Sequence, residues 1–308
     1  MNKRLDYSVK LVERAFGEKN ISKESRAVLA FSGGIDSTLV LNLPPVTSAV
    51  KEGAVDLLFN DTLVEFKETR EFIKRVQDEL KVNVIVAKPK LTFKEIVKRY
   101  GFPIHPRGGK DSKRSKATSM CCYYLKKAPT KKIIKEKDWS LYFTGLRADE
   151  SYNRRSMAKV YGDYFDSKTY GHKRCHPILW WSLDDVWAFQ KRAKFAYNSL
   201  YDKVTYLNDA DPDFSYENAK KYNVRTGCWC CPQGLRQGKL KWLREHFPKK
   251  FQALIIKMGL GEELLDLRIE KNKSVKSRSG QLLRDINYKE LFGVERALQM
   301  HPCYFDSL

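Results

Sequence analysis

The stretch Ala30–Leu43, which reads AFSGGIDSTLVLNL, decides the fold. A short apolar run, Ala27 to Phe31, ends in Ser-Gly-Gly, and a second apolar run begins after Asp36 and two hydroxyl residues. This order predicts a strand, a tight glycine turn and the start of a helix. Glycines let the backbone come close to a ligand, and the N–H groups at a helix start point towards an anion. The stretch therefore predicts a loop that holds an anion, with an ordinary capped turn as the alternative.

The rest of the chain alternates strand patterns with helical patterns. Apolar runs predict strands at residues 26–31, 55–59, 82–87 and 141–144. Helical patterns occupy residues 7–16, 37–43, 66–80 and 92–100, and residues 106–116 read as a basic loop. The alternation predicts the α/β class, with a doubly wound, mostly parallel sheet between flanking helices. Ligands bind such sheets beyond the carboxyl ends of the strands, where the glycine turn lies.

The length of 308 residues allows about two domains, or one large domain with an appendage. The region after about Pro232 is basic and helical in pattern, and the sequence has no internal repeat. We therefore expect one domain over residues 1–231, which carries the glycine turn, and a basic helical C-terminal subdomain over residues 232–308.

The chain carries a formal net charge of +21. An excess of this size favours a polyanionic ligand, either a nucleic acid or a nucleotide with several phosphates. A solvated, lysine-rich surface is the alternative. No apolar run is long enough to span a bilayer, and the first residues lack the pattern of a signal peptide. We expect a soluble cytoplasmic protein with no membrane partner.

The cysteines suggest metal or redox chemistry. There are seven, at Cys121, Cys122, Cys175, Cys228, Cys230, Cys231 and Cys303. An odd number without a secretion signal argues against a disulfide framework. The adjacent pair at 121–122 and the CxxC pair at 228 and 231 together offer four thiolates, the ligand set of a [4Fe-4S] cluster or a structural zinc. Adjacent cysteines suit two irons of a cluster better than one ion, because neighbouring side chains diverge; metal-free thiols are the remaining option.

The glycine turn resembles a known nucleotide loop. Residues Ser32–Ser37, SGGIDS, resemble the SGGxDS loop of the PP-loop ATP pyrophosphatase superfamily, which holds the phosphate end of an adenine nucleotide. The spacing is neither GxxxxGK[ST] nor GxGxxG. The resemblance implies the adenine nucleotide alpha-hydrolase-like fold of that superfamily for the expected first domain.

Six further blocks, in family order, resemble the sulfonucleotide reductases, which act on phosphoadenylyl sulfate and adenylyl sulfate. They read NDTLVEFKET (60–69), CCYYLKKAP (121–129), TGLRADES (144–151), PILWWSLDDVW (177–187), NSLYD (198–202) and GCWCC (227–231). Leu63 is a departure, because the DTGxxFxET segment of the family has glycine there. Ser182 also fits an ordinary helix N-cap, so the 177–187 block supports membership rather than catalysis.

The resemblance implies a sulfur-group oxidoreductase of sulfate assimilation, which cleaves phosphoadenylyl sulfate or adenylyl sulfate to sulfite and the adenosine nucleotide. It assigns eleven residues to the nucleotide and its sulfate: Ser32, Gly33, Gly34, Asp36, Ser37, Asp61, Thr62, Lys126, Arg147, Arg154 and Arg155. It also implies an electron donor protein of the thioredoxin or ferredoxin type, and leaves a homo-oligomer open.

The cysteine pattern resembles that of the cluster-bearing reductases, which have a tandem Cys-Cys and a distant CxxC. The resemblance implies a [4Fe-4S] cluster on Cys121, Cys122, Cys228 and Cys231, with Cys230 as a substitute ligand or a buried thiol. Cys303 resembles the C-terminal nucleophile of the family by position, although the ECGxH motif is absent. The nearby His301 and basic residues favour a thiolate there, and an inert terminal thiol is the alternative.

The rival interpretation is a thiolation enzyme of the same superfamily, in which the loop binds ATP and sulfur enters DNA or tRNA. Residues 225–229 (RTGCW) and 149–151 (DES) resemble the DNA phosphorothioation proteins, and the charge of +21 and the missing ECGxH favour them too. The 60–69 and 121–129 blocks favour the reductases. A non-catalytic nucleic-acid-binding protein is the third class, and the intact SGGxDS-like loop argues against it. We expect the reductase.

Overall fold

The computed structural model describes residues 2–104, 112–167, 171–231 and 238–264, and the chain falls into two compact units. The first, here called the sheet unit, consists of residues 1–90, 123–201 and 225–227. The second, the cysteine unit, consists of residues 91–122, 202–224 and 228–308. The cysteine unit takes residues from both sides of the boundary that the sequence suggested after residue 231, and that boundary stays a prediction.

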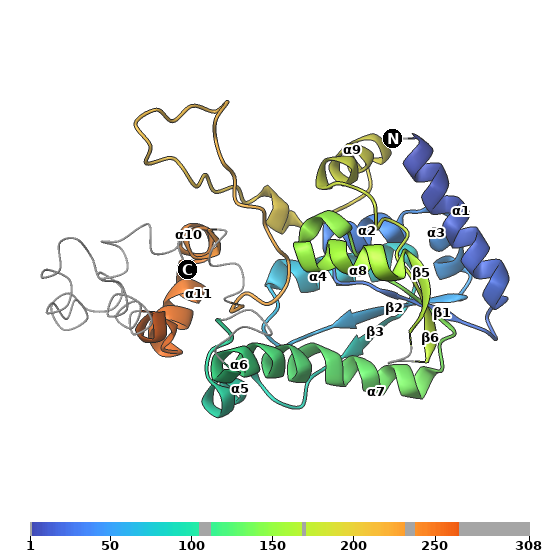
Figure 1. The fold of residues 1–308 in the computed structure, drawn as a ribbon, viewed down its shortest axis with the longest axis horizontal. Helices are drawn as coiled ribbons and strands as arrows, with labels where there is room; N and C mark the ends of the chain where they lie inside the picture. The colour runs from blue at the N-terminus through green and yellow to red at the C-terminus, as the bar shows by residue number, and fades with distance from the viewer. Residues whose placement is uncertain (1, 105–111, 168–170, 232–237, 265–308) are drawn as a thin grey trace, which may run out of the picture. The chain divides into compact units, whose positions relative to one another are not determined.

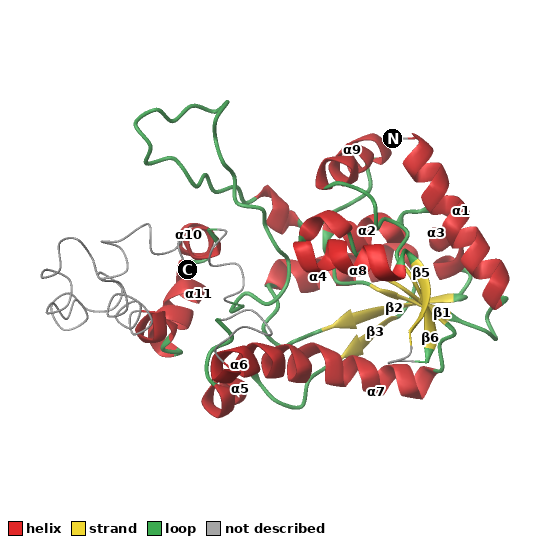
Figure 2. Ribbon diagram, viewed as in Figure 1, coloured by secondary structure: helices red, strands yellow, loops and turns green. Residues whose placement is uncertain are grey.

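The sheet unit contains a six-stranded sheet in the order β3-β2-β1-β4-β6-β5 (Figure 1, Figure 2). Its strands are β1 (Ala27–Ala30), β2 (Val55–Asn60), β3 (Val84–Ala87), β4 (Leu141–Phe143), β5 (Tyr164–Ser167) and β6 (His172–Cys175). Neighbouring strands pair in parallel, except that β5 runs antiparallel to β6. The predicted α/β class with a mostly parallel, doubly wound sheet is confirmed.

Helices cover both faces of this sheet. They are α1 (Asn2–Lys19), α2 (Ile35–Leu41), α3 (Pro44–Lys51), α4 (Lys67–Leu80), α7 (Ala128–Lys137), α8 (Tyr152–Tyr161) and α9 (Leu183–Ala193), with short helical turns at Tyr123–Lys127, Ala148–Glu150 and Ser199–Asp202. One core joins the sheet to α1, α2, α3, α4 and α9, and a second core joins its other face to α7.

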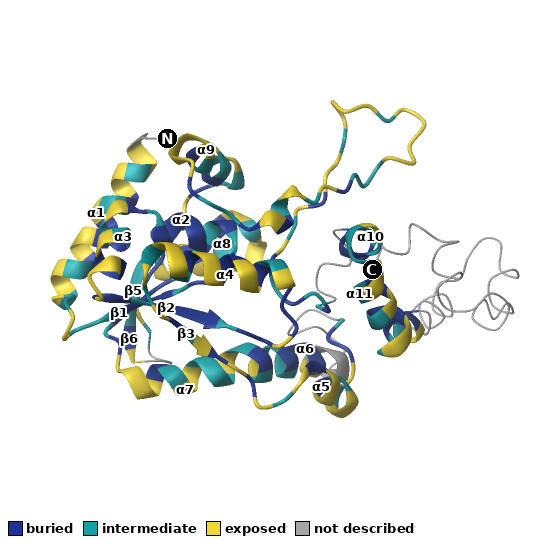
Figure 3. Ribbon diagram, turned by 180° about the vertical axis from the view of Figure 1, so that it is seen from behind, coloured by how far each residue is buried: buried dark blue, intermediate teal, exposed yellow. Residues whose placement is uncertain are grey.

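Strand β1 explains why the sequence has an unbroken apolar run here. Ala27 and Leu29 pack in the first core, whereas Val28 packs in the second core with Ile134 of α7. Successive side chains of a strand point to opposite faces, so a strand covered on both faces needs apolar residues at every position. Most residues of β1 and β2 are accordingly buried (Figure 3).

The strand order reverses between β1 and β4, and this places the candidate site. β2 and β3 follow on one side of β1, while β4 pairs with its other side. The loops that leave the carboxyl ends of β1 and β4 therefore meet. Gly145, after β4, lies against the peptide between Asp36 and Ser37, where an added Cβ would come within 2.6 Å of backbone atoms. Ligands of such sheets bind at this kind of switch point.

The cysteine unit contains α5 (Phe93–Tyr100), α6 (Ser112–Cys122), α10 (Lys239–His246), α11 (Pro248–Gln252) and a helical turn at Ala253–Lys257. Trp242 is fully buried in this unit. Its Nε1 donates to the carbonyl of Lys203 at 2.8 Å, and its ring packs against Tyr222 with centroids 5.6 Å apart. Within the described stretches, every helix is too short or too polar to cross a bilayer.

Several elements differ from the sequence-based expectation. The loop expected over residues 106–116 is partly wrong, because α6 begins at Ser112; residues 105–111 lie outside the described residues. The sequence analysis did not identify α3, α8, β5 or β6. Strands β5 (YFDS) and β6 (HKRC) carry polar residues, so they give no apolar run. Helix α3 opens on two prolines, which read as a turn although proline suits a first helical turn.

Candidate functional site

The glycine loop, defined as Ser32–Ser37, connects β1 to α2 and is held by its own hydroxyls. Gly33 has φ of +69°, a conformation that side-chain-bearing residues rarely adopt. The Oγ of Ser37 and the Oγ1 of Thr38 each donate to the carbonyl of Gly34 at 2.9 Å. The amide of Ser32 donates to Ser37 Oγ at 3.3 Å, and the Ser32 side chain is exposed. The Ser32 hydroxyl lies 3.2 Å from Ser37 Oγ and accepts from the Gly34 amide at 3.4 Å, so the loop is preformed by its own contacts.

A second segment of the sheet unit holds the start of α2. The amide of Ile35 donates to the hydroxyl of Tyr201 at 2.9 Å. A Cβ added to Gly34 would lie 3.1 Å from Thr226 Oγ1 and 3.5 Å from the Tyr201 hydroxyl, so both oxygens converge on this glycine. Burial raises the pKa of Tyr201 to about 12, so the hydroxyl stays protonated at neutral pH.

Arg147 brings a buried guanidinium to the glycine loop. It follows β4, is 5% exposed, and its Nε donates to Asp36 at 2.7 Å. Its Nη1 donates to Asp149 at 2.5 Å, and Asp149 in turn accepts from the amide of Leu183 at 3.1 Å. Burial raises the pKa of Asp36, although the charge of Arg147 acts in the opposite direction. Arg147 is therefore ion-paired before any ligand arrives.

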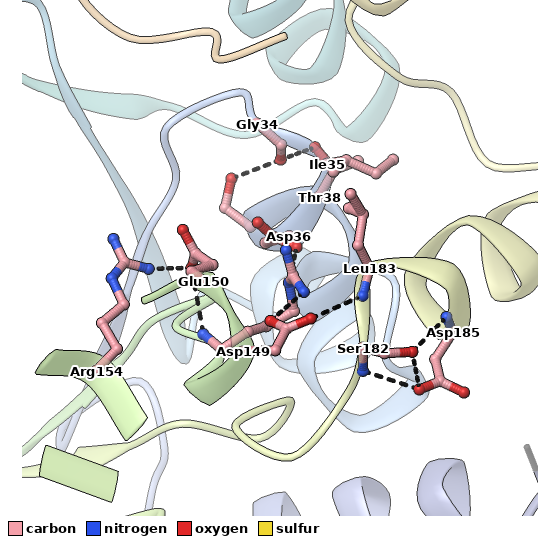
Figure 4. A network of polar contacts seen from close by, with 12 residues as sticks. Gly34, Ile35, Asp36, Thr38, Asp149, Glu150, Arg154, Ser182, Leu183 and Asp185 are labelled. Carbon is pink, nitrogen blue, oxygen red and sulfur yellow. Dashed lines mark hydrogen bonds and ion pairs between the residues drawn. The ribbon is translucent and has the colours of Figure 1, made fainter. Parts of the chain in front are cut away.

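The two remaining arginines of the block lie on α8 and differ in their surroundings. Arg154 pairs with Glu150 across one turn, and the Glu150 carboxylate also accepts from the backbone amide of Arg147 (Figure 4). Arg155, the next residue, is exposed. The structure thus connects Arg154 to the Arg147 segment through Glu150, whereas Arg155 is exposed.

The residues after β2 form a third part of the site. Asp61 accepts two hydrogen bonds from the guanidinium of Arg70, at 3.1 and 2.8 Å. Thr62 donates to the carboxylate of Glu65 at 2.7 Å. Glu65 is buried, and burial raises its pKa although the nearby charge of Lys126 acts to lower it. Lys126 also lies near Gly227, where an added Cβ would be 3.6 Å from its Nζ. All of these residues belong to the sheet unit.

The cysteines of the two sequence clusters all belong to the cysteine unit. Cys121, Cys228 and Cys230 are buried, and the amide of Cys231 donates to the carbonyl of Cys228 at 3.1 Å. Burial raises the pKa of Cys230 well above its ordinary value, and the thiols of Cys228, Cys231 and Cys121 act on it in the same direction. Lys239, 5% exposed, donates its Nζ to the carbonyl of Cys228 at 2.8 Å.

The donor chemistry of this region suits an iron–sulfur cluster, because thiols lie in a buried place beside an ammonium group that offsets negative charge. Within the described residues, however, no three His, Cys, Asp or Glu side chains form a group that could hold a metal ion. Cys122, the fourth expected ligand, is half-buried. Disulfides are absent among the six described cysteines.

Two further cysteines stand apart. Cys303, the expected nucleophile, lies outside the described residues. Cys175 lies in β6 of the sheet unit and is fully buried, and burial raises its pKa. A thiol in this setting is a packing residue rather than a nucleophile.

Sequence reasoning missed three residues that contact these groups. Tyr201 lies in the 198–202 block, which was used only for the family resemblance. Glu65 lies inside the 60–69 block at a position that the DTGxxFxET pattern leaves variable. Lys239 has no sequence signal, because one lysine in a basic stretch cannot be told from a solvated one. Tyr201 and Glu65 could have been found by asking which polar residues of each block would be buried in the predicted fold.

The fold and the loop geometry define a PP-loop type of nucleotide-binding α/β protein. A family model described as "Phosphoadenosine phosphosulfate reductase domain" matches residues 26–234, and the chain belongs to this family of sulfonucleotide reductases.

Individual relatives are distant. An uncharacterized protein of Methanocaldococcus jannaschii is 30% identical over 231 residues, which cover 73% of this chain and 40% of that protein. Adenosine 5'-phosphosulfate reductase 1 of Bacillus subtilis is 29% identical over 207 residues, which cover 66% of this chain and 78% of that enzyme. A phosphoadenylyl-sulfate reductase of Candida auris, solved as a phosphate complex, is 21% identical with a TM-score of 0.45, covering 63% of this chain and 83% of that one. This chain therefore spans less than half the length of the M. jannaschii relative.

Proposed function

We propose that the protein reductively cleaves adenylyl sulfate or phosphoadenylyl sulfate to sulfite and the adenosine nucleotide. The observation that carries the proposal is the buried guanidinium of Arg147 at the preformed glycine loop, at the switch point between β1 and β4. Arginine suits sulfate and phosphate oxygens because its planar fork donates two parallel hydrogen bonds. Membership of the reductase family supports the reaction class.

The chain supplies three kinds of group to this reaction. The glycine loop binds the phosphate end through Ser32 and the backbone of Gly33 and Gly34, with Ser37 and Asp36 holding the loop and Arg147 in place. Asp61 and Thr62 fix the segment beyond β2. The expected cations neutralise the anionic oxygens; they are Lys126, Arg147, Arg154 and Arg155.

A cysteine thiolate, proposed to be Cys303, attacks the sulfur atom. The bond between sulfur and the bridging oxygen breaks, and AMP or its 3′-phosphorylated form leaves with the electron pair. The product on the enzyme is an S-sulfocysteine. A dithiol donor protein of the thioredoxin type then attacks the cysteine sulfur, and sulfite leaves. The second donor thiol resolves the mixed disulfide, so the donor is oxidised by two electrons; a ferredoxin-type donor is the alternative.

The decisive experiment measures sulfite release from adenylyl sulfate and from phosphoadenylyl sulfate, with anaerobic protein and a dithiol reductant. We expect turnover of at least one, and the ratio of the two rates reports whether the 3′-phosphate is recognised. Full turnover by the Cys303→Ser variant would place the nucleophile elsewhere. Absence of sulfite from both substrates, in protein with intact fold, would contradict the proposal.

The cysteine unit is proposed to hold a [4Fe-4S] cluster on Cys121, Cys122, Cys228 and Cys231, with Cys230 as a substitute ligand. When bound, such a cluster orders its surroundings and adds local charge, and the Lys239 ammonium would stabilise that charge. Iron and sulfide analysis of anaerobically prepared protein tests this. Cys228→Ser should lower both contents, whereas Cys175→Ser, which removes a buried thiol of the sheet unit, should not. Equal contents in the two variants would mean that the ligand set is wrong.

A second candidate is ATP-dependent thiolation of DNA or tRNA, and one observation favours it. The cations assigned to the substrate are already accompanied by carboxylates: Arg147 by Asp36 and Asp149, and Arg154 by Glu150. Cations that are already paired attract the anionic sulfate end of a sulfonucleotide weakly. A polyphosphate that brings its own divalent cation meets less repulsion from these carboxylates.

This second candidate has a separate readout. Pyrophosphate release from ATP is measured with and without magnesium, and with and without an oligonucleotide, in the same protein preparation. Magnesium-dependent release that rises with the oligonucleotide, together with no sulfite from either sulfonucleotide, would favour thiolation. Sulfite release without any effect of magnesium would exclude it.

A further inference from the structure

We propose that Tyr201 is a positioning residue, which fixes the glycine loop so that a nucleotide meets it in one conformation. The inference rests on the proposed function of that loop, and extends it to a residue that contacts neither substrate nor reacting atoms. Tyr201 belongs to the segment 198–202 and reaches the loop from a part of the chain 166 positions away.

The tyrosine hydroxyl accepts a hydrogen bond from the Ile35 amide at 2.9 Å. The Thr226 hydroxyl lies beside the same glycine, because a Cβ added to Gly34 would be 3.5 Å from the Tyr201 oxygen and 3.1 Å from Thr226 Oγ1. Gly34, the N-cap of α2, makes no side-chain cap of its own. The Tyr201 oxygen therefore satisfies an amide at the start of α2 that a capping side chain would otherwise satisfy.

The same segment holds the other side of Gly34. Asn198 Nδ2 donates to the carbonyl of Gly33 at 3.4 Å and to Thr69 Oγ1 at 3.0 Å. Thr69 Oγ1 in turn donates to the carbonyl of Thr226 at 3.3 Å. Hydrogen bonds therefore hold the loop at the residue before Gly34 and at the residue after it. The side chains that make these bonds are also close to Thr226, Asn198 through Thr69 and Tyr201 at Gly34.

These hydrogen bonds matter because the loop contains two consecutive glycines, which have the widest backbone freedom of any residues. A loop that must be ordered at the moment of binding loses affinity, whereas a preorganised loop does not. Removing the Tyr201 hydroxyl leaves the Ile35 amide without this acceptor, so the loop conformation is expected to change. The expected effect is weaker ground-state binding, so KM rises more than kcat falls.

The test compares Tyr201→Phe with Tyr197→Phe. Both tyrosines pack edge-on against Trp187, with centroids 5.2 and 5.5 Å from it, and it is the Tyr201 hydroxyl that accepts the Ile35 amide of the loop. Equilibrium dialysis with adenylyl sulfate, phosphoadenylyl sulfate and ATP gives the dissociation constants. We expect Tyr201→Phe to bind the preferred nucleotide about tenfold more weakly, and Tyr197→Phe to bind within about twofold of wild type.

Thr226 supplies a rescue experiment. Thr226→Ser keeps the hydroxyl that lies beside Gly34 together with the Tyr201 oxygen, whereas Thr226→Val keeps the shape and removes it. Near-normal binding by the serine variant, with weaker binding by the valine variant, is the expected pattern. Equal affinities for Tyr201→Phe and Tyr197→Phe, or equal losses in both Thr226 variants, would overturn the inference.

Amide hydrogen exchange separates this inference from the proposed function. In ligand-free protein, the Ile35 amide should exchange faster in Tyr201→Phe than in Tyr197→Phe, because it has lost its acceptor. If wild-type protein binds none of the three nucleotides, the proposed function fails, and faster exchange still supports the positioning role. Unchanged exchange at Ile35 would overturn the positioning role whatever the binding results.

Discussion

At the scale of single residues, Arg147 is unusual because it carries a charge into the interior. A buried guanidinium is tolerated only where its donors are satisfied, and here Asp36 and Asp149 accept from different edges of the same fork. Asp36 belongs to the glycine loop and Asp149 to the segment after β4. Arg147 therefore ties together the two loops that meet at the switch point, in addition to any role with a substrate.

Arg147→Lys is expected to reduce kcat/KM for the preferred sulfonucleotide by about a hundredfold or more, because one ammonium cannot hold both carboxylates and a substrate oxyanion. Steady-state sulfite release measures the effect. The matched control is Arg155→Lys, the same change at an exposed position, with an expected effect below about tenfold. A variant Arg147→Lys with wild-type kinetics would mean that the guanidinium serves only the fold.

His176 makes stability depend on pH. It is buried beside Thr144, with Nδ1 and Oγ1 2.7 Å apart, and burial lowers its pKa from 6.5 to about 4. In the unfolded chain the imidazole becomes protonated as pH falls below 6.5, whereas in the folded protein it stays neutral until about pH 4. The contribution of His176 to the free energy of unfolding is therefore fully present above pH 6.5, and it is lost as pH falls towards 4.

The measurement is denaturant unfolding of wild type and His176→Asn across pH 4 to 7. Wild type should lose up to about 3 kcal/mol more than the variant over that window, because only wild type has a histidine here that must bind a proton on unfolding. Parallel curves for the two proteins would show that another group controls the acid sensitivity.

Sequence reasoning named Asp36 and Arg147 as site residues, and the structure pairs them at the glycine loop, but the sequence did not show how they are connected. The SGGIDS loop and Arg147 come from motifs, so their positions were expected. That Asp36 and Asp149 both pair with Arg147 was not expected, because a motif names residue types and leaves their partners open. Tyr201 was missed for a related reason: its oxygen acts on an amide 166 positions away, and no local pattern records such a pairing.

At the scale of elements, the loop after β4 and the start of α2 are packed too closely to admit a side chain at Gly145. An added Cβ on Gly145 would lie 2.6 Å from the carbonyl carbon of Asp36 and from the amide nitrogen of Ser37. Both are backbone atoms, so they cannot swing aside as a flexible side chain can. Glycine is needed here for close approach rather than for an unusual backbone angle.

Gly145→Ala is therefore expected to destabilise the protein by roughly 1–3 kcal/mol, because α2 or the loop must move to admit one methyl group. It should also weaken nucleotide binding, since the glycine loop leads into α2. Gly227→Ala is the control: the nearest atom to its added Cβ is the flexible Nζ of Lys126 at 3.6 Å. Denaturant unfolding and equilibrium dialysis compare the two, and similar stabilities would contradict the steric argument.

Elements with strong local signals were predicted well, and weak ones were not. Helix α9 follows Ser182, the predicted N-cap, and the capping box with Asp185 is present. Strands β1, β2 and β4 coincide with apolar runs because each is covered on both faces. Strand β5 lies at the edge of the sheet with half-exposed residues, so tertiary pairing rather than local pattern defines it.

At the scale of the whole molecule, the dominant property is the net charge of +21. If this charge serves a polyanion, a labelled oligonucleotide should bind at low salt and dissociate as salt rises. For about six phosphate contacts, affinity should fall roughly a thousandfold between about 50 and 200 mM salt. Fluorescence anisotropy at a series of salt concentrations measures the slope. No binding at the lowest salt would mean that the charge is a solvated surface.

The division of the chain into units could not be inferred from sequence order. Composition changes after residue 231, and that change suggested a boundary there. That boundary stays a prediction, whereas the two compact units interleave, because each is assembled from three separate stretches of chain. Composition reports local preferences, whereas membership of a unit depends on which distant stretches pack together, and that information is spread over the whole sequence.

Interleaving has a consequence for the order of events during synthesis. The glycine loop emerges early from the ribosome, yet Tyr201, which holds the Ile35 amide, is made 166 positions later. At about 5–20 residues per second, the loop waits on the order of ten to thirty seconds for this partner, and slightly longer for Thr226. The nascent chain must therefore carry its nucleotide loop in an unfinished state for most of its translation. A chaperone that covers nascent apolar strands would be most useful in that interval.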